Sequence, residues 1–117
     1  MSDKVSIVVP TRNRRNFLRQ AMRSAHTQTF RDIELLVVDE ASSDGTAEMM
    51  AAEFPAVRLI RNGQPRGPGG ARNTGVAAAD GDWILFLDDD DLLHPEHVAA
   101  LVKASHATPA DTVVSGQ

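Results

Sequence analysis

Short apolar runs alternate along this chain with longer segments in which apolar residues recur every three or four positions. The runs occupy residues 4–10, 33–38, 57–60 and 82–87, and a last one covers residues 111–115. Runs of this length that are rich in β-branched and aromatic residues predict β-strands. Residues 83–87 are apolar without interruption, which is typical of a strand buried on both faces of a parallel sheet.

The segments between the runs predict helices. The first has Asn13 as its expected N-cap and an apolar face made of Phe17, Leu18, Ala21, Met22 and Ala25. The second helix runs from Thr46 to Phe54 and is stopped by Pro55. A loop at 62–70 leads into the third helix, at 71–79. The fourth helix begins at Pro95, and its Val98, Leu101 and Val102 face inward. Strands that alternate with helices predict parallel strands joined by right-handed crossovers. We therefore predict an α/β fold, a Rossmann-like, open, mainly parallel sheet with helices on both faces.

Composition narrows the class of protein. The 117 residues, 42% of them hydrophobic, suit one domain with its own core, and we find no internal repeat or linker. A net charge of −4 argues against a dedicated nucleic-acid binder. The absence of cysteine excludes disulfides and thiolate metal sites. No signal peptide or run of about 20 apolar residues is present, so we expect a cytoplasmic chain without a transmembrane segment.

Charged residues gather in two places. The acidic group is Asp88 to Asp91, directly after the run at 82–87. Four adjacent carboxylates repel one another, and Mg²⁺ or Mn²⁺ would relieve that repulsion while leaving coordination positions for substrate phosphates. The alternative is a solvated loop or the charged start of a helix, to which Glu96 would also contribute. The basic group lies on the first helix, where one or two guanidinium groups can reach a ligand: Arg12, Arg14, Arg15, Arg19 and Arg23.

Strand ends converge at one edge of the predicted sheet, where open α/β sheets bind ligands. Pro10 and Thr11 end the first strand, Asp39 ends the second, and the acidic group ends the fourth. Asp39 can accept a hydrogen bond from a base or ribose, or can cap its own turn. Arg72, in the glycine-rich segment 67–75, can bind phosphate or form a surface ion pair. That segment lacks the lysine of a Walker A loop, and no G-x-G-x-x-G follows the first strand, so NTPase and dinucleotide sites are disfavoured.

Taken together, four motifs resemble those of the family 2 glycosyltransferases of the GT-A fold. They occur in the family's order and cover nearly the whole chain, at residues 6–14, 37–46, 70–75 and 87–91. The resemblance implies an inverting, metal-dependent enzyme that takes a sugar from a nucleotide-diphosphate donor, expected to be a UDP-sugar, in polysaccharide biosynthesis. It also implies that residues 1–117 form the donor-binding part of an incomplete GT-A domain.

The resemblance also implies roles for individual residues. The nucleotide site would comprise Pro10, Thr11, Arg14, Asp39, Arg72, Asp88 and Asp89, with Thr11 at the nucleoside, Asp39 reading the base and Arg72 near the diphosphate. Asp90, as a direct ligand of Mg²⁺ or Mn²⁺, and Asp88 would form the metal site of the DxD motif. Asp91 would cap or orient, and His94 would be a helix-entry residue.

One departure from the family affects turnover. Family members have a further acceptor-binding part with an acidic general base, and no residue here fills that role. We therefore expect nucleotide binding without efficient transfer to the unknown acceptor, membrane association only through parts outside this chain, and self-association through an exposed sheet edge.

Rival functions are a catalytically silent nucleotide-binding module, a sugar-nucleotide nucleotidyltransferase and a receiver-like phosphoacceptor domain. The second is disfavoured because its glycine-rich loop should follow the first strand. The third is disfavoured because paired acids are absent from that place and Lys103 lies within a helix. The silent module remains open.

Overall fold

The structure is a computed structural model that describes residues 3–107, apart from the side chain of Pro68. Its elements are β1 (Val5–Thr11), α1 (Arg15–His26), β2 (Ile33–Glu40), α2 (Thr46–Glu53), β3 (Arg58–Asn62), α3 (Gly67–Ala78), β4 (Trp83–Phe86) and α4 (His97–Ala107). The strands form one parallel sheet in the order β3-β2-β1-β4. This arrangement confirms the predicted fold. The strand expected at 111–115 lies outside the described residues.

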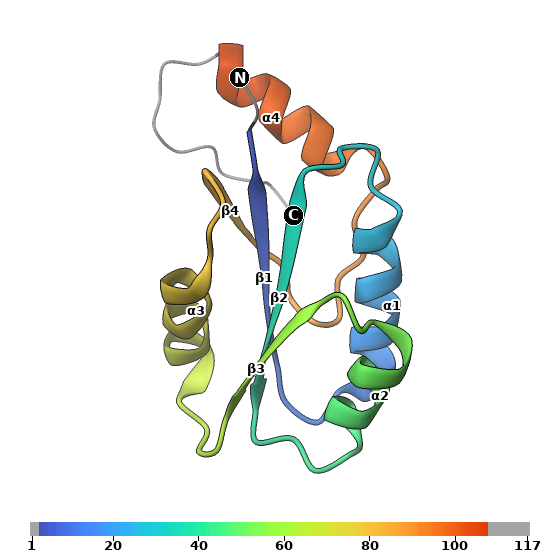
Figure 1. Ribbon diagram of the computed structural model, residues 1–117, viewed down its shortest axis with the longest axis vertical. Coiled ribbons are helices and arrows are strands. Elements are labelled where there is room, and N and C mark those ends of the chain that lie inside the picture. Colours follow the sequence, from blue (N-terminus) through green and yellow to red (C-terminus); the bar gives the residue numbers. More distant parts are fainter. Residues whose placement is uncertain (1–2, 108–117) are drawn as a thin grey trace.

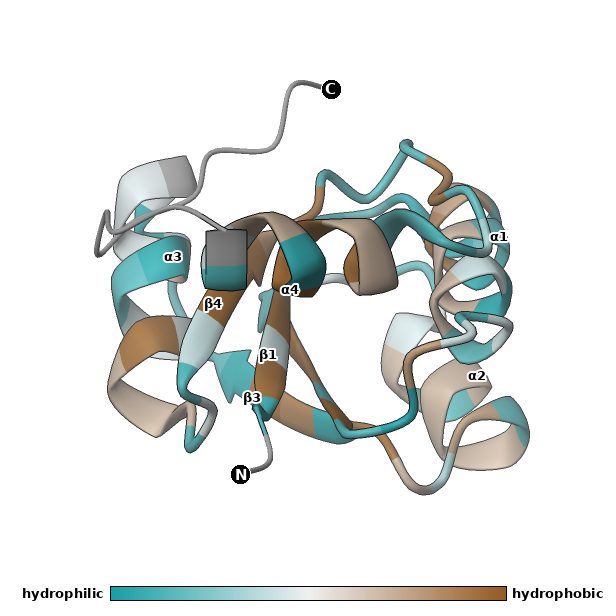
Figure 2. Ribbon diagram, turned by 90° about the horizontal axis from the view of Figure 1, so that it is seen from above, coloured by the Kyte–Doolittle hydropathy of each residue, from teal (hydrophilic) through white to brown (hydrophobic). Residues whose placement is uncertain are grey.

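Helices cover both faces of the sheet (Figure 1). The larger core cluster joins the face of the sheet that carries Ile7 and Val9 to α1, α2 and α4. The smaller cluster joins Val8 and Leu36, on the opposite face, to α3. Figure 2 shows the apolar positions of the strands between these helical layers. Alternate residues of β1, β2 and β3 therefore enter opposite cores, as strand geometry requires.

The packing of α3 on β1 is close. A Cβ atom added at Gly75 would lie 2.3 Å from Cγ1 of Val8, a distance that real side chains do not adopt. Glycine at this position therefore lets the helix approach the strand, which brings the start of α3 to the carboxyl-terminal edge of the sheet.

Two expectations for the first helix are wrong. The N-cap is Arg14, and Asn13 instead has a positive φ of 53° and accepts a hydrogen bond from the Ser43 amide. The tie to the loop after β2 holds Asn13 outside the helix. Phe17 is 56% exposed, because the buried stripe of α1 passes through Leu18, Ala21, Met22 and Ala25 and leaves the neighbouring position outside it.

Two other helix boundaries differ from the prediction. α4 begins at His97 and not at Pro95, whose carbonyl accepts a hydrogen bond from the Thr29 amide and so holds this residue in the preceding turn. His94 lies at the helix entry as expected, where its Nδ1 accepts the Glu96 amide. α3 begins at Gly67, within the segment predicted as loop.

The fourth strand is not buried on both faces. Ile84 is 39% exposed and Phe86 38% exposed, whereas Leu85 between them is buried. Within the described residues β4 pairs only with β1, so it is an edge strand. In addition, the face that carries Ile84 and Phe86 is only partly covered. Self-association through this edge stays a prediction.

Candidate functional site

A cleft of about 520 Å³ opens at the carboxyl-terminal edge of the sheet. The lining residues are Pro10, Thr11, Arg12, Arg14, Glu40, Pro65, Gly67, Ala71, Arg72, Asp88, Asp89 and Asp90. A smaller cavity of about 210 Å³, bordered by the end of α1 and the start of β2, has no carboxylate in its lining. The larger cleft therefore combines the acidic and basic groups that the sequence singled out.

Backbone pairing brings the strand ends together in this cleft. Thr11 pairs with Asp39 across β1 and β2, and the Leu87 amide donates to the Val8 carbonyl, which ties the end of β4 to β1. The Asp91 amide then donates to the Asp88 carbonyl, so the acidic segment folds into a turn at the edge of the sheet.

Asp89 is the buried member of the acidic segment. Its Oδ2 accepts a hydrogen bond of 2.9 Å from the hydroxyl of Thr11, and both side chains are buried. Its Oδ1 lies 3.5 Å from Nη1 of Arg14, which also donates to Asp90 over 3.2 Å. Burial raises the pKa of Asp89 above its ordinary value, while the Thr11 hydroxyl and the Arg14 charge oppose that rise. These contacts fix the turn that carries the other carboxylates.

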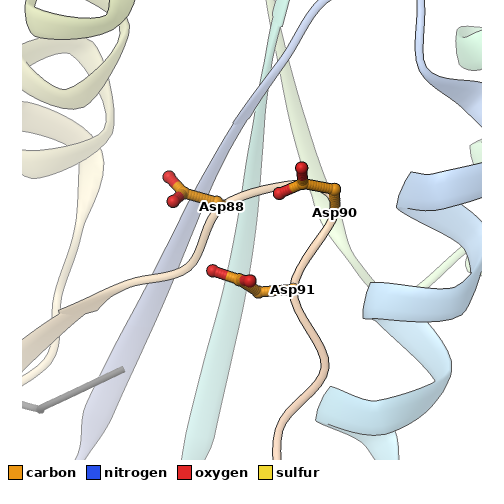
Figure 3. Close-up of side chains that lie close together, drawn as sticks. All are labelled: Asp88, Asp90 and Asp91. Carbon is orange, nitrogen blue, oxygen red and sulfur yellow. The ribbon is translucent and has the colours of Figure 1, made fainter.

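Asp88, Asp90 and Asp91 each present an oxygen, and the three oxygens lie within 4.8 Å of one another (Figure 3). Burial, followed by the charges of Asp88 and Asp90, raises the pKa of Asp91. Hard cations such as Mg²⁺ and Mn²⁺ prefer oxygen ligands at about 2.1 Å, so that ligands on opposite sides of the ion lie about 4 Å apart. The spacing and chemistry of these carboxylates fit such an ion. Asp91, expected only to cap or orient, contributes to the same cluster.

Arg72 faces the acidic turn from α3. Its Nη2 lies 3.7 Å from Oδ1 of Asp88, and its guanidinium carbon lies 5.8 Å from the ring centroid of Phe86. The contact with an aromatic face holds the planar guanidinium while leaving donors for a ligand.

Asp39 is not among the residues that line the cleft. Its side chain is fully buried. Its Oδ1 accepts a hydrogen bond from the Ser42 amide, so Asp39 does cap its own turn, which was one of the two roles that the sequence allowed. Its Oδ2 has no hydrogen-bond partner among the described residues, although Nη1 of Arg61 lies 3.9 Å away. A buried, unsatisfied carboxylate oxygen is costly and retains the capacity to accept a donor.

Glu40 is a cleft residue that the sequence analysis missed. β2 was expected to end at Asp39, but the strand continues for one more residue and brings Glu40 into the cleft wall. The sequence did offer a signal for this residue, because two polar residues, Asp39 and Glu40, follow directly after the apolar run at 33–38.

Comparison with known proteins places this arrangement in a family. The family model described as "Glycosyl transferase family 2" matches residues 6–117. The succinoglycan biosynthesis protein ExoO of Rhizobium meliloti is 40% identical over 111 residues, which are 94% of this chain and 32% of that protein.

Two solved structures share the fold. The mannosyltransferase PcManGT from Pyrobaculum calidifontis, in complex with GDP-Man and Mn²⁺, has a TM-score of 0.84 at 29% identity, over 93% of this chain and 34% of that one. TarS 1–349 of S. aureus, in complex with UDP, has a TM-score of 0.80 at 29% identity, over 88% and 33%. Both are glycosyltransferases of the GT-A fold. This chain thus spans about a third of the length of these proteins.

Proposed function

The chain belongs to glycosyltransferase family 2, and we propose that it binds a nucleotide-diphosphate sugar in the cleft as the donor part of an inverting, metal-dependent glycosyltransferase. A UDP-sugar is the donor that we favour, and residues 1–117 form the donor-binding part. The acceptor and the general base are not assigned. None of the helices among residues 3–107 is long and apolar enough to span a bilayer.

The observation that carries this proposal is the combination of charges in one cleft. Three carboxylates with the spacing of a divalent-cation site lie beside two guanidinium groups, those of Arg14 and Arg72. A diphosphate bound through a cation needs both kinds of group, because the cation and the guanidinium groups share its negative charge. The presence of UDP in one structural neighbour, and of GDP-Man with Mn²⁺ in another, supports this assignment.

Roles can be proposed for the residues at the nucleoside end. Pro10 and Thr11, at the end of β1, would line the nucleoside pocket. Asp39 would read the base, since its unsatisfied Oδ2 can accept an N–H from uracil once a movement of the surrounding residues exposes this buried oxygen. Binding would then relieve an unsatisfied buried oxygen, which favours a base that carries an N–H donor.

Roles also follow for the residues at the phosphate end. Asp90 and Asp88 would hold Mg²⁺ or Mn²⁺, with Asp91 orienting the cluster; when bound, such an ion neutralises the charge that develops on the departing nucleotide. Arg72 and Arg14 would bind the diphosphate. Asp89 would hold the acidic turn in place through Thr11 and Arg14.

A nucleotide panel followed by an assay of donor turnover tests the proposal. We expect UDP to bind more tightly than ADP, GDP or dTDP in the presence of Mn²⁺, and the chain alone to hydrolyse or transfer the sugar of UDP-sugars inefficiently. Binding of ADP as tight as that of UDP would contradict the role of Asp39, because adenine has no ring N–H to donate to Oδ2. Efficient acceptor-dependent turnover would contradict the restriction to donor binding.

A further inference from the structure

Glu40 makes two hydrogen bonds that join the end of β2 to the loop between β3 and α3. Its Oε2 accepts the side-chain amide of Asn62 over 2.8 Å, and its Oε1 accepts the backbone amide of Arg66 over 2.9 Å. The Glu40 side chain is buried, although it forms part of the cleft wall. Asn62 is its register partner on β3, so the loop leaves β3 beside Glu40 and returns to the same carboxylate at Arg66.

The loop that Glu40 holds forms the phosphate side of the proposed donor site. Pro65 and Gly67 line the cleft, and Gly67, with a positive φ of 76°, begins the helix that carries Arg72. A Cβ atom added at Gly70 would lie 2.5 Å from Cβ of Arg66, so Arg66 also packs against the first turn of α3. Fixing the Arg66 backbone therefore fixes where α3 begins.

A carboxylate suits this position because it offers two acceptor oxygens to two donors. A glutamine at the same place has one oxygen and one NH₂ group, and it keeps both contacts if the Asn62 side-chain amide turns over to offer its own oxygen. Alanine offers no acceptor, so it leaves the Arg66 amide without its partner in a buried setting, where an unmade hydrogen bond is costly.

We propose that Glu40 is a positioning residue for donor binding, which holds the loop of residues 62–66 so that the start of α3 and Arg72 face the diphosphate. This inference rests on the proposed function. Glu40 does not touch the nucleotide in this account; it acts through the Arg66 backbone.

The chain offers a matched control for this role in Glu34. Glu34 lies on the same strand and its Oε1 also accepts a backbone amide and a side-chain donor, those of Asp80 and Ser6. It joins β2 to the turn between α3 and β4, and it is not among the residues that line the cleft. Both donors share that one oxygen, which a glutamine would keep, so Glu34→Ala is the matched change: it removes the same charge and both hydrogen bonds away from the proposed site.

The experiment compares the intact chain with Glu40→Ala and Glu34→Ala by calorimetric titration of UDP with Mn²⁺, and by amide hydrogen exchange. We expect Glu40→Ala to weaken UDP binding about tenfold, the lower end of the effect of removing an outer-shell hydrogen bond. Exchange at the Arg66 amide should accelerate in the same variant. Glu34→Ala should change UDP affinity by less than about twofold, as expected for a distant substitution whose effect is independent of the site.

Separate outcomes overturn the inference and the proposed function. Equal UDP affinity in wild type and Glu40→Ala, or equal losses in both variants, would overturn the positioning role. Faster exchange throughout the sheet in Glu40→Ala would reduce Glu40 to a structural residue and would also overturn it. If the wild type bound no UDP, the proposed function would fail, and unchanged exchange at Arg66 would independently show that Glu40 does not hold the loop.

Discussion

Replacing Thr11 by valine removes one hydroxyl group from the centre of the cleft. The two side chains have nearly the same shape, so the change leaves the packing of β1 intact and exchanges the oxygen for a methyl group. Asp89 then loses the hydroxyl that donates to its Oδ2 over 2.9 Å, while Arg14, 3.5 Å from its Oδ1, remains.

The expected cost follows from burial of both partners. Thr11 is 3% exposed and Asp89 is 8% exposed, so water can replace the lost donor only poorly. A hydrogen bond to a charged group contributes about 1.5–3 kcal/mol, and the added buried methyl group returns up to about 0.8 kcal/mol. We therefore expect the free energy of unfolding to fall by about 1–2 kcal/mol at pH 7.5, or about 4 to 8 °C in Tm.

The loss should depend on pH because it concerns the charged form of Asp89. Burial raises the pKa of Asp89 in the folded chain, so protonation of this group stabilises the fold at low pH, and that stabilisation is lost as pH rises through the folded pKa. The valine variant lacks the hydroxyl that lowers this pKa, so its pKa should rise further. The difference from wild type should be largest above the folded pKa and should shrink as pH falls through it.

Urea denaturation at several pH values measures this effect, with Thr11→Ser and Thr46→Val as controls. Thr11→Ser keeps the hydroxyl and should recover most of the lost unfolding free energy. Thr46→Val removes a hydroxyl that donates to Asp44. Because water can reach Asp44, this change should lower the unfolding free energy by less than Thr11→Val does. An unchanged midpoint for Thr11→Val, or a loss of equal size at every pH, would refute the reasoning about Asp89.

Three further predictions concern other parts of the chain. Gly75→Ala should lower the free energy of unfolding by about 1–3 kcal/mol in urea denaturation, because the Cβ atom of the alanine would meet Val8. Helix propensity alone would instead raise the free energy of unfolding by about 1 kcal/mol, and such a gain would contradict the close packing of α3 on β1. Burial raises the pKa of Glu34, but its hydrogen bonds outweigh burial and lower that pKa below its ordinary value. Glu34→Gln should therefore lower the free energy of unfolding by about 1 kcal/mol near neutral pH, and by less as pH falls through the folded pKa. A difference in unfolding free energy that stays constant between about pH 3 and 7 would contradict this. Arg14→Gln should tighten Mn²⁺ binding without nucleotide by up to about fivefold in calorimetry, because Arg14 pairs with Asp90 in the half-exposed turn; weaker Mn²⁺ binding would contradict this competition.

Much of the fold could be predicted because its strands and helices have clear periodicity. The alternation of strand and helix sufficed for a parallel sheet, and the strand ends that it placed at one edge do meet there. Boundaries set by tertiary contacts could not be read in the same way. Pro95 lies outside α4 because its carbonyl accepts a hydrogen bond from Thr29, which is distant in the sequence.

Within the site, residue types were easier to predict than their burial. Asp88 and Asp90 are exposed, whereas Asp89 between them is buried and accepts a hydrogen bond from Thr11. The role that we propose for Glu40 depends on a loop that returns to β2 at Arg66, and no local pattern in the sequence specifies that return.

Calorimetric titration of UDP in the presence of Mn²⁺, repeated with EDTA and with Asp90→Asn, tests the central claim most directly. Asp90 is exposed and its carboxylate belongs to the acidic cluster, so the substitution should remove a metal ligand without unfolding the chain. We expect UDP to bind in the presence of Mn²⁺ and to lose that binding both in EDTA and in Asp90→Asn. UDP binding of equal strength under all three conditions would contradict a metal-dependent donor site at this cleft.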